Sequence, residues 1–147
     1  MSRLLGIDHG TRRVGVALSD AERRIASPLT TIEVTRDAQR VFRQIADLAG
    51  EWGAAELVVG LPLNMDGSEG PQAKAAREFG RSLERVAGLP VQFWDERLTS
   101  HSAEEAMGEA DLTRGQMKGR LDRVAAAIML QSYLDARAAA ADVTDPA

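Results

Sequence analysis

The spacing of hydrophobic and polar positions divides the first third of the chain into short strands. The apolar run at residues 4–7 predicts a buried strand, and residues 14–18 alternate between large apolar and smaller side chains as a second strand would. Gly10 permits a tight turn between them, so the two strands are expected to form a hairpin. Residues 25–34 predict a third strand, which is interrupted near Pro28 and is therefore expected at an edge or with a bulge.

The pattern then changes to helices that alternate with strands. Asp37 is suited to be the N-cap of a helix that runs to about Trp52, where Gly53 ends it. Residues 56–60 are almost wholly apolar, as in a central strand that is covered on both faces. A second helix is predicted for residues 71–87, with Gly88 as its stop.

The remainder of the chain completes an α/β pattern. Residues 91–94 predict a fifth strand, Ser102 and Glu105 have the spacing of a capping box for a short helix, and the last helix is expected over residues 120–139. The order of these elements predicts a five-stranded mixed sheet with about four helices on its faces. We expect one domain over residues 1–140, followed by a flexible C-terminal tail at residues 141–147.

Composition narrows the chemistry that the chain can perform. Its 147 residues include no cysteine and two histidines, which excludes disulfides, thiolate zinc sites, a cysteine nucleophile and a histidine-rich metal site. Any metal would bind to oxygen ligands, which favours magnesium or manganese. A net charge of −4 argues against broad nonspecific binding of nucleic acid but allows a local basic groove. No apolar run approaches the roughly 20 residues of a membrane helix, so we expect a cytoplasmic protein without membrane partners.

Two carboxylates lie at the carboxyl ends of predicted strands. Asp8 follows the run at residues 4–7, and Glu96 follows the strand at residues 91–94. Sites in α/β sheets assemble at strand carboxyl ends, so the two carboxylates could share a pocket if their strands are parallel neighbours. Asp95 and Glu96 point to opposite faces, and the sequence leaves open which of them joins Asp8. Alternatively, Asp8 accepts hydrogen bonds from the backbone of its own turn.

A third carboxylate, Asp122, lies on the predicted last helix. It shares a helical face with Ala125, Ala126 and Met129, which are small or apolar enough to be buried. The alternative is a first-turn acid that the helix dipole favours. Three carboxylates in one apolar environment would repel one another unless cations neutralised them. Two magnesium or manganese ions roughly 4 Å apart can clamp the attacking water and the leaving oxygen of a phosphodiester. The trio therefore predicts a metal-dependent nuclease.

Basic residues flank each carboxylate and are candidates for binding a phosphate backbone, because arginine pairs with phosphate through two hydrogen bonds. A solvated helix face explains the basic residues of 114–123 about as well, and His9 is expected to be a turn residue. The candidate substrate-binding residues are Arg12, Arg13, Arg97, Thr99 and Lys118.

Four segments in order carry a resemblance to a known family. They are Gly6–Ala17 with Ser19-Asp20; Val59–Pro62 with Asp66-Gly67 and Gln72-Ala73; Asp95–Thr99; and Asp122 with Ala125-Ala126, Leu130-Gln131 and Tyr133-Leu134. With these segments the chain resembles the YqgF-type (RuvX-like) family of pre-16S rRNA nucleases and Holliday-junction-resolvase-like proteins. Two departures are Ser100, where many relatives have a second threonine, and a thinner basic segment before Asp122.

The resemblance implies a ribonuclease-H-like fold, with a five-stranded mixed sheet and helices on both faces. It also implies that the acidic residues come from the first strand, the fourth strand in spatial sequence and the last helix, which are Asp8, Glu96 and Asp122 here. The expected function is a magnesium- or manganese-dependent endonuclease that acts on structured RNA in the 5′-end maturation of precursor 16S rRNA.

Three other functions stay open at this point. A Holliday-junction resolvase would act on branched DNA and, because it cuts two strands symmetrically, would be a homodimer rather than a monomer. A noncatalytic ribosome-assembly binder would retain the fold without needing the carboxylates. The segment Asp8–Thr11 is also similar to the phosphate-binding turn of actin-like and sugar kinases, but those proteins need two such domains and 147 residues supply one.

Overall fold

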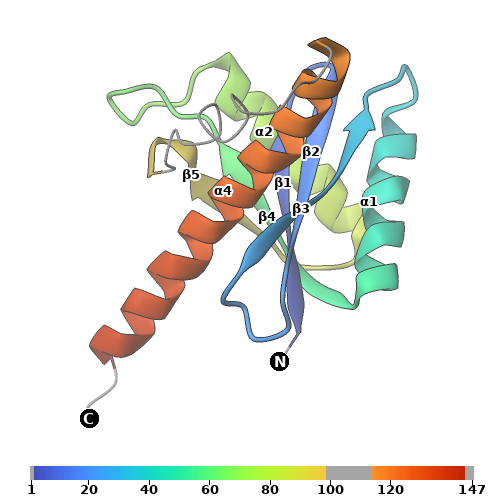
Figure 1. The fold of residues 1–147 in the computed structure, drawn as a ribbon. Helices are drawn as coiled ribbons and strands as arrows, with labels where there is room; N and C mark the ends of the chain where they lie inside the picture. The colour runs from blue at the N-terminus through green and yellow to red at the C-terminus, as the bar shows by residue number, and fades with distance from the viewer. Residues whose placement is uncertain (1, 99–113, 145–147) are drawn as a thin grey trace.

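A five-stranded mixed sheet forms the centre of the protein, as the sequence predicted (Figure 1). The computed structural model describes residues 2–98 and 114–144, with side chains from 119 to 141 in the second range. The spatial order of the strands is β3 (Ala26–Glu33), β2 (Arg13–Ser19), β1 (Arg3–His9), β4 (Ala54–Leu61) and β5 (Val91–Asp95). β1 pairs antiparallel with β2 and parallel with β4, and β4 pairs parallel with β5. The carboxyl ends of β1, β4 and β5 therefore meet at one edge of the sheet.

The predicted hairpin and the predicted interruption of the third strand are both confirmed. β3 is an edge strand, and its register against β2 shifts between two adjacent pairs: Val16 lies opposite Thr30, whereas Ala17 lies opposite Pro28. The extra residue forms a bulge. Because proline donates no hydrogen bond to a neighbouring strand, Pro28 is accommodated at a bulge in an edge strand.

Helices cover both faces of the sheet (Figure 1). α1 (Ala38–Trp52) and α2 (Pro71–Ala87) lie on one face and α4 (Arg114–Thr144) on the other, and a 3₁₀ turn, η1 (Glu96–Leu98), follows β5. The Asp37 side chain accepts a hydrogen bond from the backbone N–H of Gln39 as the predicted N-cap of α1, and left-handed Gly53 and Gly88 end α1 and α2 as predicted.

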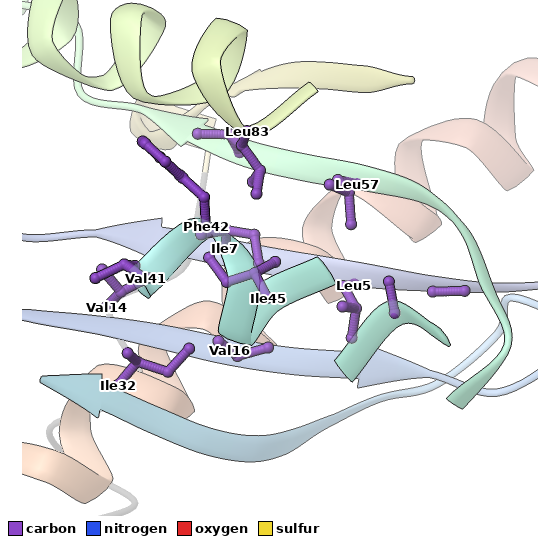
Figure 2. Packing of buried hydrophobic residues seen from close by; sticks show 13 residues of the cluster. Leu5, Ile7, Val14, Val16, Ile32, Val41, Phe42, Ile45, Leu57 and Leu83 are labelled. Atoms are coloured by element: carbon purple, nitrogen blue, oxygen red, sulfur yellow. The ribbon is translucent and has the colours of Figure 1, made fainter. Parts of the chain in front are cut away.

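Two hydrophobic cores follow from the alternation of side chains along the strands. Leu5 and Ile7 point into the core beneath α1 and α2, which Figure 2 shows in close-up, whereas Leu4 packs on the opposite face against α4. On β4, Val58 likewise faces α4 while its neighbours face α1 and α2. Because these side chains are almost completely buried, both cores hold β1 and β4 firmly in place beneath the carboxyl edge.

α4 is longer than predicted at both ends. It begins at Arg114 rather than Arg120 and continues to Thr144, so residues 141–144 of the predicted tail are helical. Alanine has the highest helix propensity, which accounts for the extension through the alanine-rich end. The predicted short helix after Ser102 lies outside the described residues. No helix within residues 2–98 and 114–144 is long and apolar enough to cross a membrane.

Candidate active site

Asp8 and Glu96 meet at the carboxyl edge of the sheet. Asp8 is the last residue but one of β1, and Glu96 opens the 3₁₀ turn directly after β5. Their side chains are joined by a hydrogen bond, so the partner that the structure shows for Asp8 is a second carboxyl group rather than its own turn. The two residues are 88 positions apart in the sequence, and the parallel strands bring them together.

Gly60 makes this contact possible. β4 lies between β1 and β5, so the strands that carry the two carboxylates are not neighbours. The Glu96 carboxylate occupies the space where a Cβ atom of Gly60 would lie. The position that the resemblance implied for this acid, the fourth strand in spatial order, is wrong, because Glu96 follows β5, the fifth strand. The Glu96 side chain reaches Asp8 by passing over Gly60, near the end of β4, the fourth strand in spatial order.

Asp95 turns away from this pair. It binds the Arg97 guanidinium, with 2.7 Å between Oδ2 and Nη2, and this interaction lowers the pKa of the Asp95 carboxyl group. Arg97 also donates a hydrogen bond from Nη1 to the Met65 carbonyl at 3.1 Å, which ties the end of β5 to the loop that follows β4. Of the two acids that alternation left open, Glu96 is the one that contacts Asp8.

Asp122 approaches from the opposite face on α4. Its Oδ2 atom lies 2.6 Å from Nε of Arg13, the first residue of β2. The backbone of α4 is close to the sheet at this point, because the Asp122 carbonyl occupies the space where Gly15 would carry a Cβ atom. Gly15 lies opposite Asp8 in the β1–β2 ladder, so this close approach brings the third carboxylate to the same edge.

The electrostatics of the cluster differ between its members, since Asp122 pairs with Arg13 whereas Asp8 faces Glu96. Burial raises the pKa of Asp8 to about 8, and the charge and hydrogen bond of Glu96 and the charge of Asp122 add to this effect. In the described part of the chain, no group of three or more carboxylate or imidazole side chains has the geometry of a metal site. Asp122 pairs with Arg13 instead. Asp8 and Glu96 nevertheless offer the hard oxygen donors that Mg²⁺ and Mn²⁺ prefer.

His9 is a strand residue, and its prediction as a turn residue is wrong. It ends β1, and its imidazole stacks on the Phe79 ring of α2, with 4.4 Å between ring centroids and 25° between planes. Burial lowers the pKa of His9. The sequence carries no signal for this role of Phe79, because an apolar residue on an amphipathic helix indicates only a core position.

Of the three other predicted substrate-binding residues, Arg12, Thr99 and Lys118, the structure describes the side chain of Arg12. Arg12 is exposed in the turn after β1, and its carbonyl accepts a hydrogen bond from the Val34 N–H at 2.9 Å. Thr99 lies outside the described residues, and so does the side chain of Lys118 on α4. The roles of Gly15 and Gly60 were not predicted from the sequence either. A glycine inside a strand is the available signal, since it often marks the close approach of another group.

The sequence matches the RuvX family, described as Holliday junction resolvase, over residues 2–136. The protein belongs to the RuvX family. Similar curated proteins include one from Chloroflexus aggregans, named "Putative pre-16S rRNA nuclease", which is 49% identical over 91% of this chain and 94% of its own. A protein of the same name from Acidiphilium cryptum is 46% identical over 91% of this chain and 84% of its own.

Solved structures show the fold of this RuvX protein independently. T. thermophilus RuvC in complex with a Holliday junction substrate has a TM-score of 0.60 at 16% identity, over 95% of this chain and 97% of that one. The yeast mitochondrial Holliday junction resolvase Ydc2 has a TM-score of 0.51 at 13% identity, over 93% and 79% of the two chains. The ribonuclease-H-like fold that the resemblance implied is thus confirmed.

Proposed function

We propose that this RuvX protein is a metal-dependent endonuclease that hydrolyses phosphodiester bonds in structured RNA. The observation that carries the proposal is the contact between Asp8 and Glu96, two carboxyl groups from separate strands that are partly buried side by side. Retaining such a pair costs folding free energy, because burial and the neighbouring Glu96 raise the cost of ionising Asp8. A site that binds a divalent cation would recover this cost.

Asp8, Glu96 and Asp122 are the residues that would hold Mg²⁺ or Mn²⁺. When bound, such an ion supplies a water molecule of lowered pKa and positive charge near the leaving oxygen. Arg13 holds the Asp122 carboxylate in position through their 2.6 Å contact. Exposed Arg12 follows β1, and its guanidinium group could pair with a substrate phosphate. Exposed Arg97 follows β5 and could do the same if it exchanged its contact with Asp95.

The names of the curated relatives support precursor 16S rRNA as the substrate. We place the cleavage at its 5′ end, during ribosome biogenesis, as the family resemblance implies. This role would place the protein in the cytoplasm. Thr99 and Lys118 stay candidate substrate contacts together with the three arginines.

Cleavage of end-labelled RNA tests the proposal directly. An RNA that spans the 5′ end of precursor 16S rRNA is incubated with Mg²⁺ or Mn²⁺ and the wild-type protein, Asp8→Asn or Glu96→Gln. Asp47→Asn, which changes an exposed carboxylate on α1, is the matched control. We expect cutting that EDTA abolishes, that both site variants lose by at least 100-fold, and that the control retains. Cutting that survives Asp8→Asn unchanged would contradict the proposal.

Resolution of a four-way DNA junction is the second candidate, and the description of the family favours it. The same assay with a mobile junction separates the two substrates, because a resolvase makes paired symmetric cuts and acts as a dimer. Symmetric junction cutting by a dimer, without RNA cutting, would replace RNA with branched DNA. If neither substrate is cut and Asp8→Ala cells process rRNA normally, a noncatalytic assembly role is supported instead.

A further inference from the structure

A cavity of about 500 Å³ adjoins the carboxylate pair. It opens between the end of β1, the end of β4 and the first turn of α2, and the Glu96 side chain forms part of its wall. Its volume is in the range of pockets that hold small ligands, about 300–1,000 Å³. Any group bound there lies directly beside the site at which the proposed reaction takes place.

The walls of this cavity suit a flat heterocycle better than a phosphate. Pro62, Pro71 and Ala75 supply apolar surface, and His9 supplies an aromatic ring. Among the described residues that line the cavity there is no lysine or arginine, and the Glu96 carboxylate would repel an anion. Nucleobases, in contrast, are recognised by stacking on rings and by hydrogen bonds to their edges.

Gln72 supplies the hydrogen-bonding group. Its amide side chain offers both donors and an acceptor, which can match the complementary edge of a base. It is the second residue of α2, directly after Pro71, whose ring fixes the backbone at the start of the helix. The Phe79 ring stacks on the His9 ring, and its centroid lies 5.2 Å from that of the Phe42 ring in the core. The aromatic wall of the cavity and the backbone that carries Gln72 are therefore already held in place.

We infer that this cavity binds the nucleobase next to the scissile phosphodiester and that Gln72 reads the edge of that base. The inference rests on the proposed function, because it assigns a position of the same substrate. It predicts that cleavage depends on the identity of one base beside the cut, although the carboxylates themselves contact only the backbone.

Cleavage of an RNA library with one randomised base on each side of the cut tests this inference. Gln72→Ala removes the reading group, and Ala75→Leu fills the cavity from an exposed position on α2, so both variants should fold. Gln92→Ala, at an exposed position on β5, is the matched control. For the wild type and Gln92→Ala we expect one base to be preferred about tenfold at one position. Gln72→Ala should reduce this preference to about twofold while cutting continues, and Ala75→Leu should lower kcat/KM at least tenfold for every base.

The outcomes separate this inference from the proposed function. If the wild type cuts RNA and neither variant changes the base profile or kcat/KM, the inference is overturned and the nuclease function stands. If the wild type cuts nothing, nucleotide binding decides: the ¹⁵N-labelled protein in EDTA is titrated with AMP, CMP, GMP, UMP and ribose 5-phosphate. Saturable shifts of the Gln72 and Ala75 amide signals with at least one nucleotide, but not with ribose 5-phosphate, support the base pocket. Equal shifts with ribose 5-phosphate, or none at all, overturn it.

Discussion

The geometry of the acid pair depends on the absence of a side chain at Gly60. A methyl group there would overlap the Glu96 carboxylate, and a flexible side chain yields more easily than a central strand does. We therefore expect Gly60→Ala to fold but to move Glu96 away from Asp8, with a loss of at least tenfold in kcat, about 1.4 kcal/mol of barrier. Gly50→Ala on α1, where a Cβ atom meets nothing within 4 Å, should keep full activity and gain up to about 1 kcal/mol in stability. Equal activity of the two variants in the RNA assay would show that Glu96 does not act from this position.

Asp8 should leave a signature in the dependence of stability on pH. Its pKa is raised from 3.8 to about 8 in the folded protein, so between these values the folded state holds a proton that the unfolded state has released. The free energy of unfolding therefore decreases as pH rises through this window, by at most about 1.4 kcal/mol per pH unit from this group. Burial is the largest cause of this pKa shift, and the charge and hydrogen bond of Glu96 and the charge of Asp122 add to it. The positive charge of Arg13 faces Asp122.

Urea unfolding in EDTA at pH 5, 6, 7 and 8 measures this dependence. Asp8→Asn has no proton to release, so its stability relative to the wild type should increase steadily with pH. Asp47→Asn should instead stay parallel to the wild type. Parallel curves for Asp8→Asn as well would mean that Asp8 ionises at an ordinary pKa.

At the scale of elements, the position of α4 depends on Gly15. A Cβ atom there would overlap the Asp122 carbonyl, which belongs to a helix backbone and can move only with α4. We expect Gly15→Ala to lower the free energy of unfolding by about 1–3 kcal/mol, as overpacking does, and to weaken activity by displacing Asp122. Gly119→Ala, on α4 but with open space around its Cβ position, is the matched control and should not be destabilised. Urea unfolding of the three proteins measures the difference, and equal midpoints would show that α4 can shift at no cost.

The elements also show what the sequence can and cannot predict. Hydrophobic periodicity and capping residues were enough to predict the bounds of α1 and α2, because Asp37, Gly53 and Gly88 begin or end a helix through contacts with neighbouring residues in the sequence. Strand ends likewise indicated that Asp8 and Glu96 belong to one edge. The order of the strands is not local, however, so the crossing of Gly60 by Glu96 could not be foreseen. Nor could the pairing of Arg13 with Asp122, which joins residues 109 positions apart.

At the scale of the whole molecule, metal binding should appear as stability. A ligand that binds only the folded state stabilises it by about 2.7 kcal/mol when the ligand concentration is 100 times its Kd. For a chain of this size, each kcal/mol of added stability raises Tm by roughly 2–4 °C or somewhat more. We expect Mg²⁺ or Mn²⁺ to raise Tm in proportion to the logarithm of its concentration. Because the ion competes with the proton on Asp8, whose pKa is about 8, the increase in Tm should be larger at pH 8 than at pH 6.

Thermal unfolding of the variants separates this site from nonspecific effects of the salt. Asp8→Asn and Glu96→Gln should lose most of the increase in Tm, while Asp47→Asn should keep it, because its carboxylate is exposed on α1 away from the sheet edge. Asp122→Asn should lose part of it, since Asp122 must exchange its contact with Arg13 for the ion. An increase that is the same in all four variants would mean that the cation acts on the surface as a whole. The carboxylate pair would then have to be explained without a metal.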